Sequence, residues 1–399
     1  MTVRFVTLGC KVNAEETQQL REGLMLAGFV PALPEEKADL TVVNTCSVTH
    51  LSDAKSRRSI EAAKREGGFV AVLGCYVSIH EERIEGVDLC LDSEHKGEAL
   101  ERILDAFSLD VPDRIPTAEM HPRTRTYIKV QDGCDSYCSY CIIPYARGCA
   151  RSEPEQEILR TVAMRLEEGF KEVVLTGIHL SSYGRDTGSS LEELIVKISE
   201  LSPERIRLGS LEQGIITASF LETLQRVPSF CDHFHLSLQS GSEKVLRDMN
   251  RKYTPEEYEK KVQLIREYFP QAAITTDIIV GFPTESDREF EETISFVRRI
   301  GFASVHVFSY SRREGTEAAK LADLDARIKK RRSAQLRQVV QEEQEKYLDT
   351  FVGKEVSVLF EDHGGLTPQY ARVEVAFPPE AGTIQKRKVL RREGLLLKA

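Results

Sequence analysis

The chain has 399 residues, 41% of them hydrophobic, and a net charge of −9. This length suggests two or three domains, each large enough to bury a core of its own. The sequence contains no apolar run near the ~20 residues of a membrane span, and its N-terminus lacks the features of a signal peptide. We therefore expect a cytoplasmic protein that does not enter a membrane.

The nine cysteines are not expected to form disulfides in such a chain. Free thiols remain available for metals, for catalysis or for packing. Lys and Arg outnumber Asp and Glu from residue 320 onward, although the whole chain is acidic. A nucleic acid would encounter this local basic region, so the net charge does not exclude nucleic-acid binding.

The first 111 residues alternate between strand and helix patterns. Short apolar runs predict buried strands at residues 4–8, 39–45, 69–74 and 87–91. Amphipathic stretches predict helices at residues 15–28, 52–67 and 95–107. This alternation predicts an α/β domain with a parallel sheet over residues 1–111. Residues 110–126 contain three prolines and no periodicity, so we interpret them as a linker.

A second alternating series begins at residue 127. Six strands are predicted at residues 127–133, 172–177, 205–210, 233–240, 273–283 and 304–311. Amphipathic helical stretches lie between them, and no seventh or eighth unit is evident. The pattern predicts a partial (β/α)6 barrel over residues 120–345, with the reaction centre at the C-terminal ends of its strands.

The C-terminal part begins with a long charged stretch at 323–353, which predicts a helix that leaves the barrel as a connector. Alternating segments at 354–362, 370–377 and 386–397 then predict a small antiparallel β domain over residues 346–399.

Three cysteines lie within eight residues just after the first barrel strand, at Cys134, Cys138 and Cys141. We expect this loop to lie over the barrel mouth. Three thiolates can hold a 4Fe–4S cluster and leave its fourth iron open for the amino and carboxylate groups of S-adenosylmethionine (SAM). The spacing, with Tyr140 before the last cysteine, differs from the ferredoxin spacings. The alternatives are buried thiols or a zinc knuckle, for which Cys149 could be the fourth ligand.

Three further cysteines, Cys10, Cys46 and Cys75, each follow a predicted strand of the N-terminal sheet. The C-terminal ends of parallel strands share one edge of the sheet, where α/β folds bind ligands. We therefore predict that these three thiols converge on a second cluster with an open iron, although each alone could be a core residue. Cys90 and Cys231 are interpreted as structural.

The motifs around these cysteines resemble the radical-SAM methylthiotransferase family over the whole chain. They are TLGCKVN, VVNTCSVT, VLGCY, GCDSYCSYCIIPYARG, LSLQSGSEKVLRDMNRKYT and DIIVGFPTE, in that order. The resemblance implies a methylthiotransferase domain, a radical-SAM barrel and a small RNA-binding β domain of the TRAM type. In two places the sequence departs from the family pattern. Glu153 occupies a position where a third arginine is common, and the final domain looks short.

The GCKVN context is similar to the branch that acts on threonylcarbamoyladenosine in tRNA, the MtaB-type enzymes. Relatives acting on isopentenyladenosine tend to read GCQMN, and those acting on a ribosomal-protein aspartate tend to read GCPKN. Activity on isopentenyladenosine and activity on a ribosomal-protein aspartate both remain alternative functions. A third alternative, from another class, is a non-catalytic RNA-binding protein whose cysteines bind zinc.

The resemblance implies insertion of a methylthio group at carbon 2 of the modified adenosine at tRNA position 37. Two SAM molecules and two 4Fe–4S clusters would be used. One SAM would methylate a sulfur associated with the cluster of Cys10, Cys46 and Cys75, and the other would be cleaved at the Cys134/Cys138/Cys141 cluster to start radical chemistry. The implied partners are the anticodon stem-loop of tRNA and an electron donor such as flavodoxin or ferredoxin. We expect a monomer.

Contacts to SAM are predicted at Tyr140 and at the ends of the barrel strands. The strand-end candidates are Thr176, Gly177, Glu212, Gln239, Ser240, Gly281 and Pro283. Each could equally be a structural turn residue, and His179 could be a proton carrier or a polar loop residue. Contacts to tRNA are predicted at Arg147, Arg151, Lys386, Arg387 and Lys388. Arg147 and Arg151 could instead pair with the SAM carboxylate, and the basic run 329–332 could be an RNA contact or a solvated helix face.

Overall fold

The computed structural model describes residues 1–80, 84–111 and 124–399. The chain forms two compact units. The first comprises Met1–Met120, Gly133–Ala150 and Ser311–Thr316, and the second comprises His121–Asp132, Arg151–Tyr310 and Glu317–Ala399. The cysteine loop is therefore part of the N-terminal unit, although it follows a barrel strand in the sequence. Most of the predicted linker lies outside the described residues.

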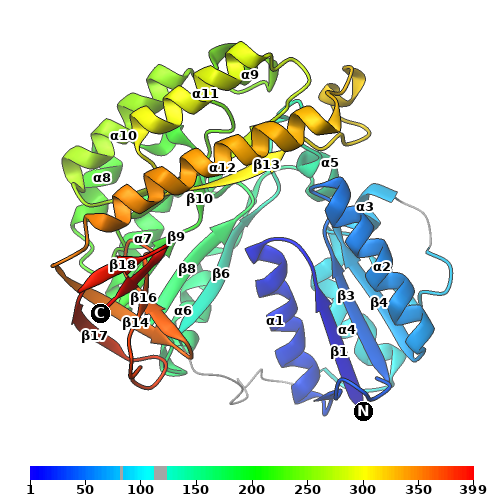
Figure 1. Ribbon diagram of the computed structural model, residues 1–399. Coiled ribbons are helices and arrows are strands. Elements are labelled where there is room, and N and C mark those ends of the chain that lie inside the picture. Colours follow the sequence, from blue (N-terminus) through cyan, green and yellow to red (C-terminus); the bar gives the residue numbers. More distant parts are fainter. Residues whose placement is uncertain (81–83, 112–123) are drawn as a thin grey trace. The chain divides into compact units, whose positions relative to one another are not determined.

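The N-terminal unit is built on a five-stranded parallel sheet in the order β2-β1-β3-β4-β5 (Figure 1). Its strands are β1 (Thr2–Thr7), β2 (Val30–Pro31), β3 (Leu40–Thr45), β4 (Phe69–Gly74) and β5 (Leu89–Leu91). Its helices are α1 (Lys11–Leu26), α2 (His50–Glu66), α3 (Cys75–His80), α4 (Ala99–Ala106) and the short α5 (Ile143–Arg147) of the cysteine loop, with a 3-10 turn η1 (His95–Glu98) before α4. The predicted parallel α/β domain is confirmed.

Alternation along each strand divides the buried side chains of this sheet between two hydrophobic layers. On β3, Leu40 and Val42 pack with residues of α1 and α4, whereas Val43 packs with Ile60 of α2. The sheet is therefore covered by helices on both faces, which explains why its strands read as continuous apolar runs.

The second unit contains all six of the predicted barrel strands. They form two parallel arrays, β6-β8-β9 and β10-β11-β12-β13, and a short β7 adds an antiparallel edge to β6. The bounds are β6 (Arg125–Asp132), β7 (Arg151–Ser152), β8 (Glu172–Gly177), β9 (Arg205–Leu208), β10 (Ser210–Leu211), β11 (His233–Leu236), β12 (Ala273–Val280) and β13 (Ser304–Ser309).

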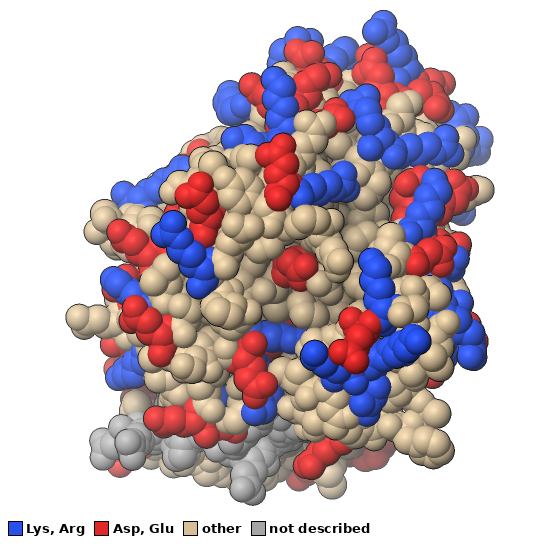
Figure 2. Space-filling view, turned by 90° about the vertical axis from the view of Figure 1, so that its left-hand side faces the viewer, with Lys and Arg blue, Asp and Glu red and all other residues tan. Residues whose placement is uncertain are grey.

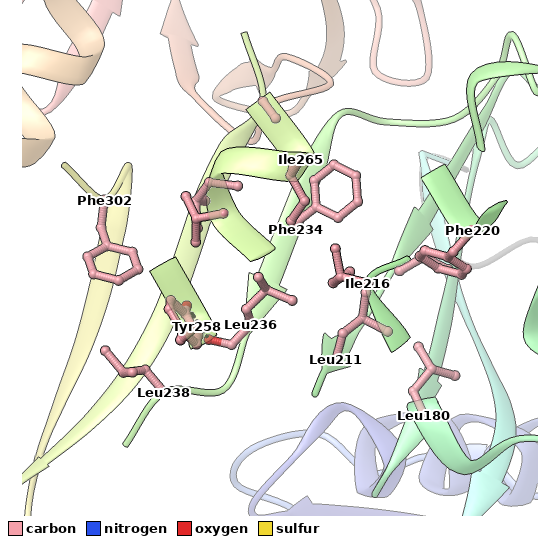
Figure 3. Packing of buried hydrophobic residues seen from close by; sticks show 14 of the residues in the cluster. Leu180, Leu211, Ile216, Phe220, Phe234, Leu236, Leu238, Tyr258, Ile265 and Phe302 are labelled. Atoms are coloured by element: carbon pink, nitrogen blue, oxygen red, sulfur yellow. Dashed lines mark hydrogen bonds between the residues drawn. The ribbon is translucent and has the colours of Figure 1, made fainter. Parts of the chain in front are cut away.

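Amphipathic helices cover the outer face of these strands. They are α6 (Glu155–Glu167), α7 (Leu191–Glu200), α8 (Ala218–Gln225), α9 (Glu243–Asp248), α10 (Pro255–Tyr268) and α11 (Asp287–Ile300), with 3-10 turns η2 (Leu180–Ser182), η3 (Gln213–Ile215) and η4 (Glu317–Lys320). Capping boxes start α10 at Thr254 and α11 at Ser286. Figure 3 shows the core between strands and helices, where Tyr258 of α10 reaches the β11 strand and its hydroxyl donates to the Leu236 carbonyl at 3.1 Å.

The sequence predicted that the long charged helix would leave the barrel. In the structure this helix, α12 (Ala326–Asp349), instead packs against the barrel. It runs alongside α11 and β13 (Figure 1). Leu336, Val339 and Val340 form an apolar stripe that enters the main core of the unit. The prediction failed because the stripe is narrow, and the many charges on the other faces of the helix obscure it.

The C-terminal residues form a six-stranded sheet in the order β17-β14-β15-β16-β19-β18. Its strands are β14 (Glu355–Glu361), β15 (Gly364–Leu366), β16 (Arg372–Glu374), β17 (Ile384–Lys388), β18 (Arg391–Glu393) and β19 (Leu396–Lys398). The pairing is antiparallel, as predicted, except that β16 and β19 run parallel. No helix in the described parts of the chain has the length and apolar character needed to cross a bilayer.

Candidate functional site: two cysteine triads

Cys46 and Cys75 directly follow strands of the parallel sheet, and Cys10 lies three residues beyond the end of another. Cys10 caps α1, Cys46 follows β3, and Cys75 begins α3. The ends of β1, β3 and β4 lie level in the sheet, because Thr7 pairs with Asn44 and Thr45 pairs with Gly74. The three thiols therefore lie along one edge of the sheet.

The electrostatics of Cys46 reflect this convergence. Burial raises the pKa of the Cys46 thiol, and charge on neighbouring Cys75 and Cys10 raises it further. A metal that binds here must displace the Cys46 proton, so binding would be favoured as the pH rises.

Three glycines with left-handed backbone precede Cys10, Cys75 and Cys134. Gly9 has φ +103°, Gly74 has φ +97° and Gly133 has φ +69°. A Cβ on Gly9 would lie 2.7 Å from the Cys46 Cβ, and one on Gly133 would lie 1.9 Å from a backbone oxygen of the same loop. Only glycine permits both the left-handed turn and the close approach. The Gly-Cys pairs in the sequence are a signal for these turns that our sequence reading did not use.

Asn13, in the first turn of α1, ties together the chain segments that carry two of the cysteines. Its buried side-chain amide donates to the Leu8 carbonyl at 2.7 Å and to the Thr45 carbonyl at 2.8 Å. Leu8 lies two residues before Cys10, and Thr45 immediately precedes Cys46. A single side chain thus fixes the relative positions of the two strand ends.

The cysteine loop joins this network through Arg147 of α5. Its guanidinium donates to the Asn13 Oδ1 at 2.6 Å and pairs with Glu16 at 3.4 Å. Lys96 pairs with the same carboxylate at 2.7 Å and also reaches the Asn13 Oδ1 at 3.2 Å. The Arg147 side chain is fully buried.

The burial of Arg147 conflicts with the predicted contact between this residue and tRNA. A guanidinium that is enclosed and bonded to Asn13 and Glu16 cannot reach an RNA phosphate without leaving those partners. The structure instead makes Arg147 a positioning residue, which attaches the cysteine loop to the sheet edge that carries Cys10 and Cys46.

The loop with Cys134, Cys138 and Cys141 is closed by its own backbone. The Cys134 amide donates to the Gly148 carbonyl at 3.1 Å, and the Cys141 amide donates to the Cys138 carbonyl at 3.0 Å. All three cysteines and Tyr140 are half-buried. The thiols are thus presented on a short folded loop whose ends are joined.

The spacing of the sulfurs bears on the choice between zinc and an iron–sulfur cluster. Thiolates at ~2.3 Å from one zinc ion lie within ~4 Å of each other. In the described residues, one group of at least three potential metal ligands has its ligand atoms within 4.8 Å of one another. That group contains no cysteine. Cluster thiolates stand farther apart, because a cube of iron and sulfide lies between them. Within the part of the chain that the structure describes, neither triad is therefore drawn together as closely as the ligands of a single zinc ion.

The cysteines outside the two triads differ in burial, and burial fits the predicted structural role best for Cys231. Cys231 is buried beyond α8, and burial raises the pKa of its thiol to about 12. Cys90 is half-buried on β5, and Cys149 is exposed.

The barrel strands end in a polar cluster around Glu212. Its carboxylate pairs with Arg251 at 2.9 Å and with His179 at 3.5 Å. Burial alone would raise the pKa of Glu212, but the hydrogen bond with His179 and the charge of Arg251 outweigh it and lower the pKa to about 2. Glu212 is thus held as a carboxylate. Our sequence reading missed Arg251.

The other strand-end candidates for SAM contacts make mainly backbone and structural contacts. Gln239 has a left-handed φ of +73°, and its backbone pairs with β12 through Asp277 and Ile279. The Ser240 hydroxyl lies 3.3 Å from that of Thr293. The Gly281 amide donates to Glu285 at 2.8 Å.

Three further candidates, Thr176, Gly177 and Pro283, lie at or near strand ends. Thr176 is buried and Gly177 is half-buried at the end of β8, whereas Pro283 is half-buried just beyond β12. Nothing in these positions contradicts the predicted SAM contacts, which stay predictions.

The predicted RNA-binding residues of the second unit differ in their exposure. Lys386 and Lys388 are exposed on β17, whereas Arg387 is half-buried and lies over the Phe360 ring at 5.5 Å. Arg151 is exposed and pairs with Asp132 at 3.2 Å. In the run 329–332, Lys329 pairs with Asp323 and Arg332 with Glu285, so both cations serve the fold. On the face shown in Figure 2, basic and acidic side chains are interspersed.

Comparison with known proteins identifies the two parts of the chain. A model of the radical SAM superfamily matches residues 128–297, and the model "Uncharacterized protein family UPF0004" matches residues 2–93. The chain is 37% identical to the threonylcarbamoyladenosine tRNA methylthiotransferase MtaB of Aquifex aeolicus, over 96% of this chain and 99% of that protein. It is 37% identical to MtaB of Bacillus subtilis, over 83% and 78% of the two chains.

A second group of relatives is somewhat more distant. The tRNA-2-methylthio-N(6)-dimethylallyladenosine synthase of Bacillus pumilus is 32% identical, over 96% of this chain and 82% of that protein. Among solved structures, the radical SAM methyltransferase TsrM of Kitasatospora setae shares the fold with a TM-score of 0.57 at 14% identity, over 79% and 76% of the two chains. The Cys134/Cys138/Cys141 loop lies within the matched radical-SAM region, and the other triad lies within the matched N-terminal region. This chain belongs to the radical-SAM methylthiotransferase family.

Proposed function

We propose that this protein is a tRNA methylthiotransferase that adds a methylthio group to carbon 2 of N6-threonylcarbamoyladenosine at tRNA position 37. The observation that supports this most strongly is that one compact unit contains both cysteine triads, joined by the Asn13–Arg147 hydrogen bond. A second triad of thiols beside the radical-SAM loop suits sulfur insertion, and the MtaB relatives indicate the nucleoside.

In this proposal Cys134, Cys138 and Cys141 hold one 4Fe–4S cluster, and Cys10, Cys46 and Cys75 hold the other. When bound, the first cluster supplies the electron that cleaves SAM, and the second carries the sulfur to be transferred. The role of the protein chain is to position the cysteines. Gly9, Gly74 and Gly133 turn the chain into each site, and Asn13 keeps two of the cysteine-bearing strand ends in register.

The predicted SAM contacts are retained as part of the proposal. Glu212, which is held as a carboxylate by Arg251 and His179, is the candidate with the strongest polar character. Its low pKa would keep it negatively charged throughout the physiological range. It therefore suits an interaction with a hydroxyl or an ammonium group of the cofactor.

The partners of the reaction are also proposed. The anticodon stem-loop would present the modified adenosine, and the exposed Lys386 and Lys388 of β17 would contact its phosphates. A small electron-transfer protein such as flavodoxin or ferredoxin would reduce the radical-SAM cluster. We propose that the protein acts as a monomer in the cytoplasm.

Cysteine variants of the reconstituted enzyme test the division of labour between the two triads. Cys134→Ala should abolish release of 5′-deoxyadenosine from SAM, whereas Cys46→Ala should preserve SAM cleavage but stop methylthiolation. Cys149→Ala, at an exposed cysteine outside both triads, is the matched control and should retain both activities. Full methylthiolation by the Cys46 variant, measured by nucleoside mass spectrometry, would refute the second-cluster assignment.

The choice of nucleoside is tested separately with two anticodon stem-loops, one carrying threonylcarbamoyladenosine and one carrying isopentenyladenosine. Only the first should gain a methylthio group. Modification of the second alone would reassign the protein to the other tRNA branch. Failure of both, with intact SAM cleavage, would point to a protein substrate.

A further inference from the structure

A row of polar side chains crosses three neighbouring strands of the barrel on the face opposite the helices. Phe234, Ile278 and Val305 of β11, β12 and β13 belong to the hydrophobic core beneath the helices. Because side chains alternate along a strand, residues of the opposite parity face the inside of the barrel. His235 of β11, Asp277 of β12 and His306 of β13 belong to this inner set.

The three side chains lie close enough to bind one ion. One ligand atom from each of His235, Asp277 and His306 falls within 4.8 Å of the other two, and the described residues contain no other group that meets this condition. His235 Nε2 lies 3.3 Å from an Asp277 carboxylate oxygen. Asp277 and His306 are direct cross-strand partners, and the two imidazole rings are 5.9 Å apart.

A neighbouring hydroxyl fixes the orientation of one ligand. Thr275 Oγ1 lies 3.0 Å from His235 Nδ1, and the same hydroxyl lies 3.1 Å from His233 Nε2. With Nδ1 engaged by Thr275, the Nε2 of His235 is the nitrogen directed at Asp277. Metal-binding histidines characteristically use their second ring nitrogen in this way.

The charge balance at the site favours a cation. The ion pairs of the described residues give Asp277 a histidine partner and no lysine or arginine. Its side chain keeps 28% of its exposure, that of His235 keeps 12%, and His306 is exposed. A carboxylate flanked by two imidazoles, within reach of solvent, can accept a metal ion from outside.

We propose that His235, Asp277 and His306 form a binding site for a divalent transition-metal ion that uses none of the nine cysteines. Two imidazoles and one carboxylate suit Zn²⁺, Fe²⁺ or Mn²⁺ and leave coordination positions open. The site does not depend on the proposed methylthiolation. It is a property of the barrel interior and would persist whichever nucleoside is the substrate.

The test measures Mn²⁺ binding to the full-length, cluster-loaded enzyme by the loss of the free Mn²⁺ signal in electron paramagnetic resonance. Mn²⁺ is a suitable probe because it prefers nitrogen and oxygen ligands to thiolates. The wild-type chain should bind one ion that Zn²⁺ displaces. Asp277→Asn and His306→Ala should each raise the dissociation constant by at least about tenfold, and Thr275→Val by about tenfold.

His363→Ala is the matched control, because His363 is an exposed histidine on the turn between β14 and β15. It should bind Mn²⁺ as the wild type does. His306 is itself exposed, so its replacement should leave the fold intact, which circular dichroism and cluster absorbance would verify. Equal Mn²⁺ binding by the wild type and by both ligand variants, or no binding by the wild type, would overturn the proposal and leave His235 and Asp277 as a simple ion pair.

Discussion

Asn13 shows how one side chain can organise two distant cysteines. Its amide nitrogen serves the strand ends before Cys10 and Cys46, and its oxygen serves Arg147 and Lys96. All four contacts lie in a largely buried region, where an unmade hydrogen bond costs about 1–3 kcal/mol.

Asn13→Ala should therefore impair the second cluster more than the first. The strand ends before Cys10 and Cys46 would lose their common donor, whereas Arg147 would keep its pairing with Glu16. We expect iron after reconstitution to fall from about eight to about four per chain, since each cluster contains four irons. Methylthiolation should be lost, and SAM cleavage should be largely retained.

Gln18→Ala is the control for this prediction, because Gln18 lies on the same helix with its side chain exposed. It should load iron as the wild type does. Unchanged iron content in the Asn13 variant would contradict the role given to this residue.

Arg147 illustrates what a sequence alone does not disclose. An arginine in a loop after a cysteine motif is typical of a phosphate contact, and we predicted one. Its partners, Asn13 and Glu16, lie more than a hundred positions earlier in the chain, and only the fold brings them together. The six cysteines that we propose as cluster ligands could be singled out from the sequence, because spacing and position after apolar strands are local features.

At the scale of secondary structure, the buried strands were the most predictable elements. The predicted ranges 69–74 and 172–177 coincide with β4 and β8. The predicted strand at 233–240 ends early, at Leu236, and Gln239 farther along has a left-handed backbone and forms an isolated bridge to Ile278 of β12. The two-residue β2 was not predicted, since a proline in so short an edge strand gives no strand pattern.

Strand β17 supports a prediction about tRNA binding. Lys386 and Lys388 share one exposed face, and Arg387 points to the other side of the sheet against Phe360. Changing both lysines to glutamine should weaken tRNA binding and reduce the slope of log K against log salt by about 2, because each phosphate contact releases about one counterion.

Binding to the anticodon stem-loop would be measured by fluorescence anisotropy at several salt concentrations. Lys330→Gln with Arg331→Gln on α12 is the comparison variant: it removes the same charge from the run 329–332, for which a solvated helix face was the alternative to an RNA contact. An unchanged salt slope in the β17 variant, or an equal loss in the α12 variant, would argue against β17 as the contact surface.

At the scale of the whole second unit, a buried charge cluster holds the C-terminal sheet against the barrel. Glu172 is fully buried and pairs with Arg207 at 2.7 Å and with Arg125 at 2.9 Å. Arg207 also donates to the carbonyls of Thr367 and Pro368.

The same arginines also contact an aromatic ring from the C-terminal sheet. The Tyr370 ring lies 4.6 Å from the Arg207 guanidinium and 5.3 Å from that of Arg125. Because side chains alternate along β9, Arg205 and Arg207 are predicted to face away from the core beneath the helices. The alternation does not reveal which residues cover them. The residues that do so, 366–370, lie about 160 positions away in the sequence.

Glu172→Gln should therefore destabilise the whole unit. The change keeps the shape of the side chain but leaves Arg125 and Arg207 without a buried counter-charge, a loss that costs about 3–5 kcal/mol in comparable sites. We expect a lower urea midpoint at pH 7. Glu167→Gln, at an exposed position on α6, should unfold like the wild type.

The pH dependence of this effect follows from the pKa of Glu172. Burial alone would raise the pKa, but the charge and hydrogen bond of Arg207 and the charge of Arg125 outweigh burial and hold it below its usual range. Because the folded pKa is lower than the unfolded value of about 4.3, the ionised carboxylate stabilises the fold above that pH, and its contribution is lost as the pH falls toward the folded pKa. The difference between wild type and Glu172→Gln in urea midpoint should accordingly be largest near neutral pH and shrink below about pH 4. A difference that stayed constant across this range would show that Glu172 acts through packing and not through its charge.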